Sequence, residues 1–230
     1  MPKAVLFDLD GTLVDSLPEL HEGVARTARE LGLREPDSCV TARMIGKGIK
    51  VLAERLAAWW RELEPLPEGV DTTTIVERLS ANWCAMTGER VQPLPGAFEA
   101  VRALRCAGVR TALVTNKIRP LTEAFLESRG VADAFDAVLT GSDVERLKPE
   151  PDMLLAALKA LGIAPGEAVM VGDSGNDALA GRRAGVRVCL VESGYNEGVP
   201  MKVWAAAHGF DEVDVDVAAL VERLLKEAEQ

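Results

Sequence analysis

Two aspartates stand two residues apart, directly after an apolar run near the N-terminus. The run Ala4–Phe7 is followed by Asp8, Leu9, Asp10 and Gly11. In an extended chain alternate side chains point to the same side, so both carboxylates would face one way while Leu9 packs on the other. Neighbouring carboxylates repel each other unless a cation or a bound proton relieves them. The spacing therefore predicts a partner for the pair.

Further polar side chains stand in three later segments. Thr115 and Asn116 end one apolar run, Lys148 precedes a helix-like segment, and Asp173 and Asp177 follow another run. In an open parallel sheet the carboxyl ends of the strands meet at one edge, where ligands bind. We expect these side chains to gather with the opening pair at that edge. The expected cluster contains Asp8, Asp10, Thr115, Lys148, Asp173 and Asp177.

The elements that must position this cluster alternate between short apolar runs and helix-like segments. The expected strands are Ala4–Phe7, Thr111–Thr115, Ala137–Thr140, Ala168–Val171 and Val186–Val191. The expected helices include Ala97–Cys106, Leu121–Ser128, Met153–Leu161 and a last helix at Val217–Glu229. The acidic stretch Asp211–Asp216 is interpreted as a solvated turn. This rhythm predicts an α/β fold with a Rossmann-like parallel-sheet core.

Residues 16–92 break the rhythm, because helical periodicity replaces strands there. Apolar spacings of three and four predict helices at Leu17–Leu31, Ile49–Leu63 and Thr74–Thr87. We expect the tryptophans of this stretch to pack between the helices, because large aromatic side chains usually supply buried area. They are Trp59, Trp60 and Trp83. The predicted organisation is a core of residues 1–15 and 93–230 with a helical insert at 16–92.

Composition excludes several classes of protein. The 230 residues carry a net charge of -10, which works against nonspecific attraction to nucleic acid or an anionic membrane. The apolar runs are too short to cross a bilayer and no secretory signal is visible, so a cytoplasmic location is expected. The four cysteines are scattered without a Cys-x-x-Cys pair, which favours reduced, mostly buried thiols over a zinc site.

The polar segments form four motifs in the order of a known family. They are Asp8-Leu9-Asp10-Gly11-Thr12, Thr115-Asn116, Lys148-Pro149 and Gly172-Asp173-Ser174-Gly175-Asn176-Asp177. With them the chain resembles the haloacid dehalogenase (HAD) superfamily of aspartate-nucleophile phosphatases over essentially its whole length. The resemblance implies that the helical insert after the first motif is the family's small cap domain.

The resemblance also implies phosphoryl transfer at Asp8. A carboxylate can attack phosphorus and form an aspartyl phosphate, which splits one difficult hydrolysis into two displacements. Asp8 occupies the nucleophile position and Asp10 the position of the general acid and base. Hard oxygen ligands beside a phosphoryl group favour Mg²⁺, with Asp8, the backbone carbonyl of Asp10 and Asp173 as its protein ligands.

By the same resemblance, the other motif residues would surround the phosphoryl group. Thr115 and the backbone amide of Asn116 would bind its oxygens, and Lys148 would offset the charge on it and on Asp8. Asp177 would hold a metal-bound water or orient Lys148.

Two further segments, Met44–Ile49 and Ser193–Gly198, are similar to those of phosphoglycolate phosphatases. The first opens a helix, and its free backbone amides, reinforced by Lys47 and Arg43, would suit a substrate carboxylate. The expected reaction is therefore the hydrolysis of 2-phosphoglycolate to glycolate and phosphate. We expect a small phosphorylated metabolite as the only partner of a monomer or homodimer, without nucleic acid or membrane.

Several alternatives stay open. Related enzymes act on sugar phosphates or nucleotides, and a sugar-phosphate mutase would keep both aspartates. A dehalogenase typically lacks the second aspartate, so Asp10 argues against that activity. A signalling receiver domain also has an acceptor aspartate and a lysine, but it would need neither a cap nor a general acid two residues on.

Overall fold

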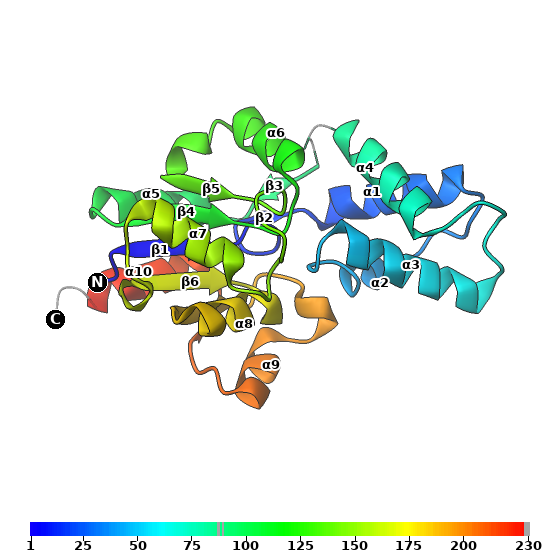
Figure 1. Cartoon of the computed structure of the whole chain (residues 1–230). Coiled ribbons are helices and arrows are strands. Elements are labelled where there is room, and N and C mark those ends of the chain that lie inside the picture. Colours follow the sequence, from blue (N-terminus) through cyan, green and yellow to red (C-terminus); the bar gives the residue numbers. More distant parts are fainter. Residues whose placement is uncertain (87, 89, 228–230) are drawn as a thin grey trace.

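The computed structural model describes residues 1–86, 88 and 90–227, which form a sheet-based core and a bundle of helices beside it (Figure 1). The strands are β1 (Ala4–Phe7), β2 (Val14–Asp15), β3 (Gln92–Pro93), β4 (Arg110–Val114), β5 (Ala137–Leu139), β6 (Ala168–Gly172), β7 (Arg187–Val191) and β8 (Val213–Asp214). The helices are α1 (Leu17–Glu30), α2 (Ser38–Ala42), α3 (Ile49–Leu63), α4 (Thr72–Cys84), α5 (Ala97–Cys106), α6 (Arg119–Arg129), α7 (Asp152–Leu161), α8 (Gly175–Ala184), α9 (Met201–His208) and α10 (Val217–Glu227).

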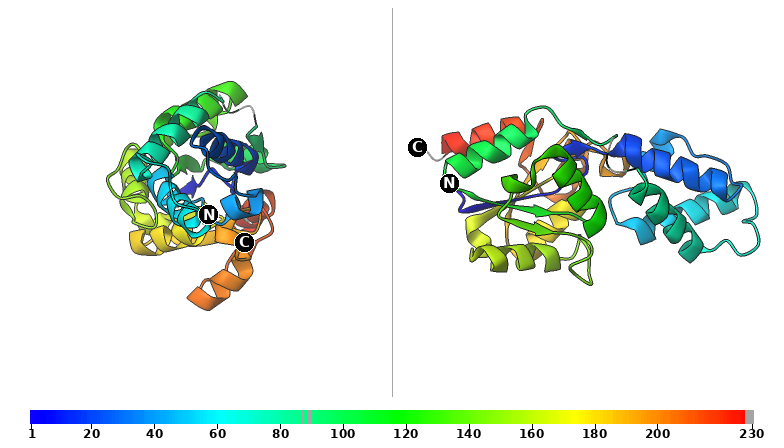
Figure 2. Two further views of the ribbon diagram at one scale, coloured as in Figure 1. Left: turned by 90° about the vertical axis from the view of Figure 1, so that its right-hand side faces the viewer. Right: turned by 90° about the horizontal axis from the view of Figure 1, so that it is seen from above.

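The core is a six-stranded parallel sheet in the order β5-β4-β1-β6-β7-β8. Along β1, Ala4 and Leu6 pack into one apolar cluster, and Val5 and Phe7 pack into another on the opposite face. Helices α7 and α8 cover the first face, and α5 and α10 cover the second (Figure 2). Because both faces are buried, the strands are continuous apolar runs, which is why the sequence pattern finds them.

Helices α1, α3 and α4 pack together around a separate apolar cluster. Trp60 is fully buried in it and Trp83 is almost so, as expected of tryptophans that pack between helices. The chain enters the bundle after β2 and returns through β3, and these two short strands pair with each other. The pairing holds the two connections side by side between the core and the bundle (Figure 2).

The α/β fold with a Rossmann-like sheet is confirmed, and two lesser expectations are wrong. The stretch taken as a solvated turn contains β8, whose Val213 and Asp214 extend the sheet beside β7. Cys39, Cys84 and Cys106 are exposed, and only Cys189 among the cysteines is buried.

Some expectations have no test in this structure. The last residue of the predicted helix Thr74–Thr87 and the residue Glu229 of the predicted last helix lie outside the described residues. The domain bounds 1–15, 93–230 and 16–92 stay a prediction. Within the described part of the chain, no helix is both long and apolar enough to cross a membrane.

Candidate active site

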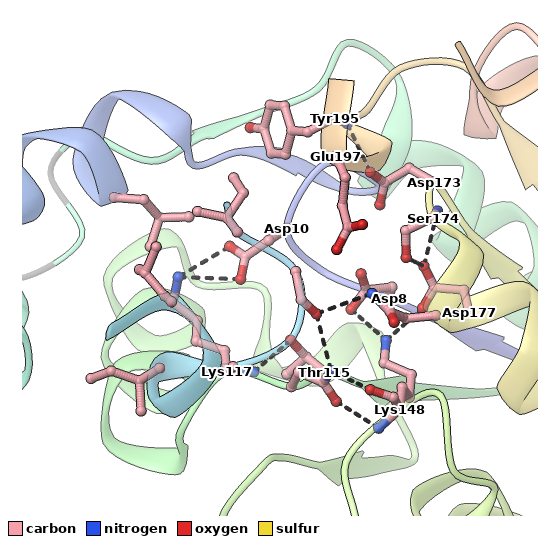
Figure 3. Close-up of a pocket in the computed structure, with 18 of the residues that line it drawn as sticks. Asp8, Asp10, Thr115, Lys117, Lys148, Asp173, Ser174, Asp177, Tyr195 and Glu197 are labelled. Atoms are coloured by element: carbon pink, nitrogen blue, oxygen red, sulfur yellow. Dashed lines mark hydrogen bonds and ion pairs between the residues drawn. The ribbon is translucent and has the colours of Figure 1, made fainter. Parts of the chain in front are cut away.

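The side chains that follow the central strands meet at the carboxyl edge of the sheet. β1 lies between β4 and β6, and its last residue, Phe7, pairs with Leu113 and Val171. The backbone N–H of Asp8 donates to the Val171 carbonyl at 2.9 Å, so Asp8 continues the line of the strand. Figure 3 shows the residues after these strands converging with Lys148 from the loop before α7.

Lys148 links two of the carboxylates. Its ammonium nitrogen lies 2.8 Å from Asp8 Oδ1 and 2.6 Å from Asp177 Oδ1, and it donates to the Val114 carbonyl at 2.8 Å. The Asn116 side chain fixes the backbone of Lys148, because Oδ1 accepts from its N–H and Nδ2 donates to its carbonyl, both at 2.9 Å. All three ammonium hydrogens therefore have acceptors, and Lys148 is a fixed counter-charge to Asp8.

Asp173 is held from two sides. Its Oδ1 accepts from the Thr12 hydroxyl at 3.0 Å, and its Oδ2 accepts from the Tyr195 backbone N–H at 2.9 Å. A Cβ atom at Gly11 or Gly194 would collide with the Asp173 carboxylate, so both positions require glycine. The backbone at these two glycines therefore packs directly against the Asp173 carboxylate and fixes its position.

Asp177 has both oxygens engaged. Oδ1 accepts from Lys148, and Oδ2 accepts from the backbone N–H and the hydroxyl of Ser174 at 3.1 and 2.6 Å. The pair Ser174 and Asp177 forms the capping box that opens α8. This geometry suits the positioning of Lys148 better than direct contact with an ion.

Burial dominates the electrostatics of the cluster. Asp8, Asp173 and Asp177 are buried and each offers an oxygen within 4.8 Å of the others. Burial raises the pKa of Asp8 well above its usual value, against the influence of Lys148, and burial raises the pKa of Asp173 to about 7. Burial opposes the charge of Lys148, yet Asp177 and Asp8 hold its pKa above the usual range. One ammonium does not balance three carboxylates, so the cluster favours a further cation.

The donor set indicates which cation fits. Among the described residues that line the cavity at this edge, the titratable oxygen groups are carboxylates and the phenol of Tyr195, and neither histidine nor cysteine is present. Such a set suits a hard divalent ion such as Mg²⁺. Asp8 Oδ2 makes no hydrogen bond to the described residues, and two hydrogen bonds fix the carboxylate of Asp173. These two side chains would therefore hold the ion.

Asp10 stands apart from this cluster and has a partner that the sequence did not predict. Its two oxygens lie 3.0 and 3.4 Å from the ammonium nitrogen of Lys117, whose side chain is only 7% exposed. Lys117 directly follows Thr115 and Asn116, and this adjacency to the second motif was the signal available in the sequence. The Thr115 hydroxyl accepts from the Lys117 backbone N–H at 3.2 Å, which ties the loop together.

A cavity lies between the sheet edge and the helical bundle, and the bundle gives it an apolar wall. The bundle residues with large apolar side chains along it are Leu20, Ile45, Ile49, Leu52 and Trp83. The loop before α3 also touches the core directly, because Asn116 Nδ2 donates to the Gly46 carbonyl at 3.1 Å. The bundle therefore lies over the charged edge.

Lys47 and Arg43 do not line this cavity. The ammonium of Lys47 lies 3.0 Å from Glu197 Oε1, and Arg55 lies 2.8 Å from the same oxygen. A Cβ atom at Gly198 would collide with the Arg43 side chain, so Arg43 packs against the loop after β7. The role of Lys47 and Arg43 in substrate binding stays a prediction.

Tyr195 connects the charged edge to the start of the bundle. Its hydroxyl donates to Asp15 Oδ1 at 2.6 Å and accepts from the backbone N–H groups of Ser16 and Leu17, both at 3.0 Å. Its own N–H binds Asp173. One residue thus joins a carboxylate of the cluster to the chain segment that leads into α1, a link that only the folded chain reveals.

Comparison with known proteins agrees with this geometry. The family model of haloacid dehalogenase-like hydrolases matches residues 2–185. Phosphoglycolate phosphatases of Thiobacillus denitrificans and Rhodospirillum rubrum are 34% and 37% identical, covering 86% and 85% of this chain and 87% and 82% of their own length. A crystal structure from Haemophilus somnus, described as a predicted phosphoglycolate phosphatase, has a TM-score of 0.89 at 27% identity and covers 96% of this chain and 97% of its own. The chain belongs to the haloacid dehalogenase-like hydrolases.

Proposed function

We propose that this enzyme is a Mg²⁺-dependent phosphatase that hydrolyses 2-phosphoglycolate to glycolate and phosphate through an aspartyl phosphate. The observation that carries the proposal is that only one of the two carboxylate oxygens of Asp8 is paired. Lys148 holds one oxygen of this buried carboxylate, and the other makes no hydrogen bond to the described residues at the edge of the cavity. The names of the relatives support the choice of substrate.

In the first displacement, Asp8 attacks phosphorus and the bond from phosphorus to the ester oxygen breaks. Asp10, in its protonated form, gives a proton to that leaving oxygen, which becomes the hydroxyl group of glycolate. In the second displacement, Asp10 takes a proton from water, which attacks phosphorus and breaks the bond to Asp8. Phosphate is released and both carboxylates return to their starting states.

The other residues of the edge would bind the phosphoryl group in both displacements. The Thr115 hydroxyl accepts from a backbone N–H, which leaves its own hydrogen to donate to a phosphoryl oxygen. The backbone amide of Asn116 would donate beside it, and the charge of Lys148 would offset that of the phosphoryl group. Mg²⁺ held by Asp8, the Asp10 carbonyl and Asp173 would neutralise charge that develops on the phosphoryl oxygens.

The covered cavity favours a small substrate. Its apolar wall on the bundle side would limit the access of water to the charged edge while the aspartyl phosphate forms. A two-carbon phosphate fits a site between the sheet edge and the bundle better than a phosphorylated protein does.

The proposal is tested by measuring phosphate release from a substrate panel with Mg²⁺ and with chelator. The panel contains 2-phosphoglycolate, glycerol phosphates, hexose phosphates and nucleoside monophosphates, and a parallel assay follows phosphotransfer to glucose 1-phosphate. We expect a large preference for 2-phosphoglycolate that disappears with chelator. Metal-dependent activity spread over other esters would remove the proposed substrate, and phosphotransfer without phosphate release would indicate a mutase instead.

A further inference from the structure

We infer that Lys117 is the receptor for the carboxylate of the substrate and thereby determines its specificity. The inference rests on the proposed function and names the residue that would distinguish phosphoglycolate from an uncharged ester. Its starting point is an ammonium group that is nearly buried at the cavity and held by the residue expected to contact the leaving oxygen.

Few cations can meet a second anionic group in this cavity. Among the described residues that line it, the cationic side chains are those of Lys117 and Lys148. Lys148 already donates to Asp8, Asp177 and a backbone carbonyl, so it has no hydrogen left for a substrate carboxylate. Lys117 is therefore the available charge.

Two cations of the bundle, Lys47 and Arg55, pair with Glu197. Glu197 Oε1 accepts from both Lys47 and Arg55. Burial opposes the charge of Glu197, yet these two cations hold its pKa below the usual value, so it stays ionised and keeps them. Lys47 also does not line the cavity, whereas Lys117 does, so Lys117 is the more direct receptor for a substrate carboxylate.

Lys117 is held at the position that the substrate requires. Its charge faces Asp10 and also acts on the buried carboxyl of Glu19. In 2-phosphoglycolate, two carbon atoms separate the leaving oxygen from the far oxygens of the carboxylate. A cation in contact with the carboxyl that binds the leaving oxygen is therefore within hydrogen-bond reach of the substrate carboxylate.

Binding of the correct substrate would exchange the partner of Lys117. Before binding, the ammonium holds both oxygens of Asp10. When the substrate carboxylate pairs with Lys117, Asp10 loses its counter-charge, takes up a proton from solvent and presents that O–H to the leaving oxygen. An ester without a second anion leaves Asp10 bound to the lysine, so the structure discriminates against it at the reacting group as well as by affinity.

The experiment compares 2-phosphoglycolate with ethyl phosphate, which has the same leaving-group carbon skeleton without the carboxylate. In Lys117→Met we expect the ratio of kcat/KM for the two substrates to fall by about 30- to 100-fold, the effect of losing a charge-assisted hydrogen bond. Inhibition by glycolate should weaken by a similar factor. Lys117→Gln provides a second variant if Lys117→Met folds poorly, and thermal melting curves check both.

Two further variants complete the design. Lys50→Met removes a charge from an exposed position on α3 and should keep the ratio of the wild type. Lys47→Met tests the competing receptor. A ratio that collapses in Lys47→Met and persists in Lys117→Met would overturn the inference, as would equal losses on both substrates in Lys117→Met.

Failure of the proposed function gives a different result. A wild-type enzyme that hydrolyses ethyl phosphate as efficiently as 2-phosphoglycolate would remove both the proposed substrate and the receptor. A wild-type preference that survives in Lys117→Met and Lys117→Gln would keep the substrate and overturn only the role of Lys117.

Discussion

An ion pair at the sheet edge is buried, whereas an ion pair between the core and the bundle is partly exposed. The side chains of Lys148 and Asp177 are 2% and 0% exposed, whereas those of Lys47 and Glu197 are 37% and 34% exposed. Breaking a buried pair leaves an uncompensated charge and costs about 3–5 kcal/mol, while an exposed pair contributes about 0–1 kcal/mol. The ion pair at the edge is therefore the costlier of the two to break.

The strands explain why the two regions differ. Asp8 and Asp173 extend from buried parallel strands whose register leaves them no freedom. Glu197 lies in a loop with a positive φ of 53°, a conformation that a residue other than glycine adopts only when its surroundings hold it there. The buried carboxylates follow strands of the sheet, whereas the ion pair with the bundle is made from a loop.

The largest expected effect comes from the fixed edge. Asp8→Asn removes the proposed nucleophile and should lower kcat by at least about 10⁴-fold on every substrate, while Asp10→Asn should lower it by about 10²–10³-fold. Single-turnover assays with trapping of the phosphoenzyme measure the first step. Residual turnover of Asp8→Asn within tenfold of wild type would show that another group attacks phosphorus.

At the buried edge, both the stability of the metal-free protein and its affinity for Mg²⁺ should depend on pH. Because burial raises the pKa of Asp173 to about 7, the metal-free folded protein takes up a proton there that the unfolded chain does not hold. The contribution of Asp173 to metal-free stability is therefore largest at low pH and is lost as pH rises to about 7, and Mg²⁺ must displace the proton below that pH.

Thermal melting at pH 5.5 and 8 with chelator, and Mg²⁺ titrations at both values, measure these effects. We expect chelated protein to be less stable at pH 8 and Mg²⁺ affinity to be weaker at pH 5.5. A chelated protein whose stability is independent of pH over this range would contradict the prediction.

Tyr195 joins the two regions, so its loss should have an intermediate effect. Tyr195→Phe removes one donated and two accepted hydrogen bonds of the hydroxyl and should cost about 1–3 kcal/mol of unfolding free energy. The backbone bond to Asp173 remains, so kcat/KM should fall by only about 3- to 10-fold. Asp15→Asn weakens the same contact, and a double-mutant cycle that showed full additivity would argue against this coupling.

The smallest effect is expected at the exposed contact. Glu197→Gln should change stability by less than about 1 kcal/mol, and its effect should shrink further in high salt. Glu150→Gln is the matched control, because the pair of Glu150 and Arg183 is similarly exposed but lies within the core. If Glu197→Gln lowered activity as much as Asp10→Asn does, the contact would belong to the reaction itself.

Local patterns predicted the fold because they reflect local physics. Buried parallel strands are continuous apolar runs, so β1, β4, β5, β6 and β7 were found within a residue or two of their observed ends. β8 was missed because two residues in an acidic stretch carry no strand pattern, and they form a strand only where the edge of β7 offers partners. The exposed cysteines were missed because apolar composition does not say which side of a helix faces the core.

The sequence by itself determined the α/β fold and placed the residues of the four motifs at strand ends, since each motif directly follows or precedes an element that local pattern defines. Only the tertiary structure decided which charges meet. Lys117 faces Asp10, 107 residues away, and Lys47 faces Glu197. Pairing among charges is a competition between groups distant in the chain, and its outcome depends on burial and on geometry that exist only after folding.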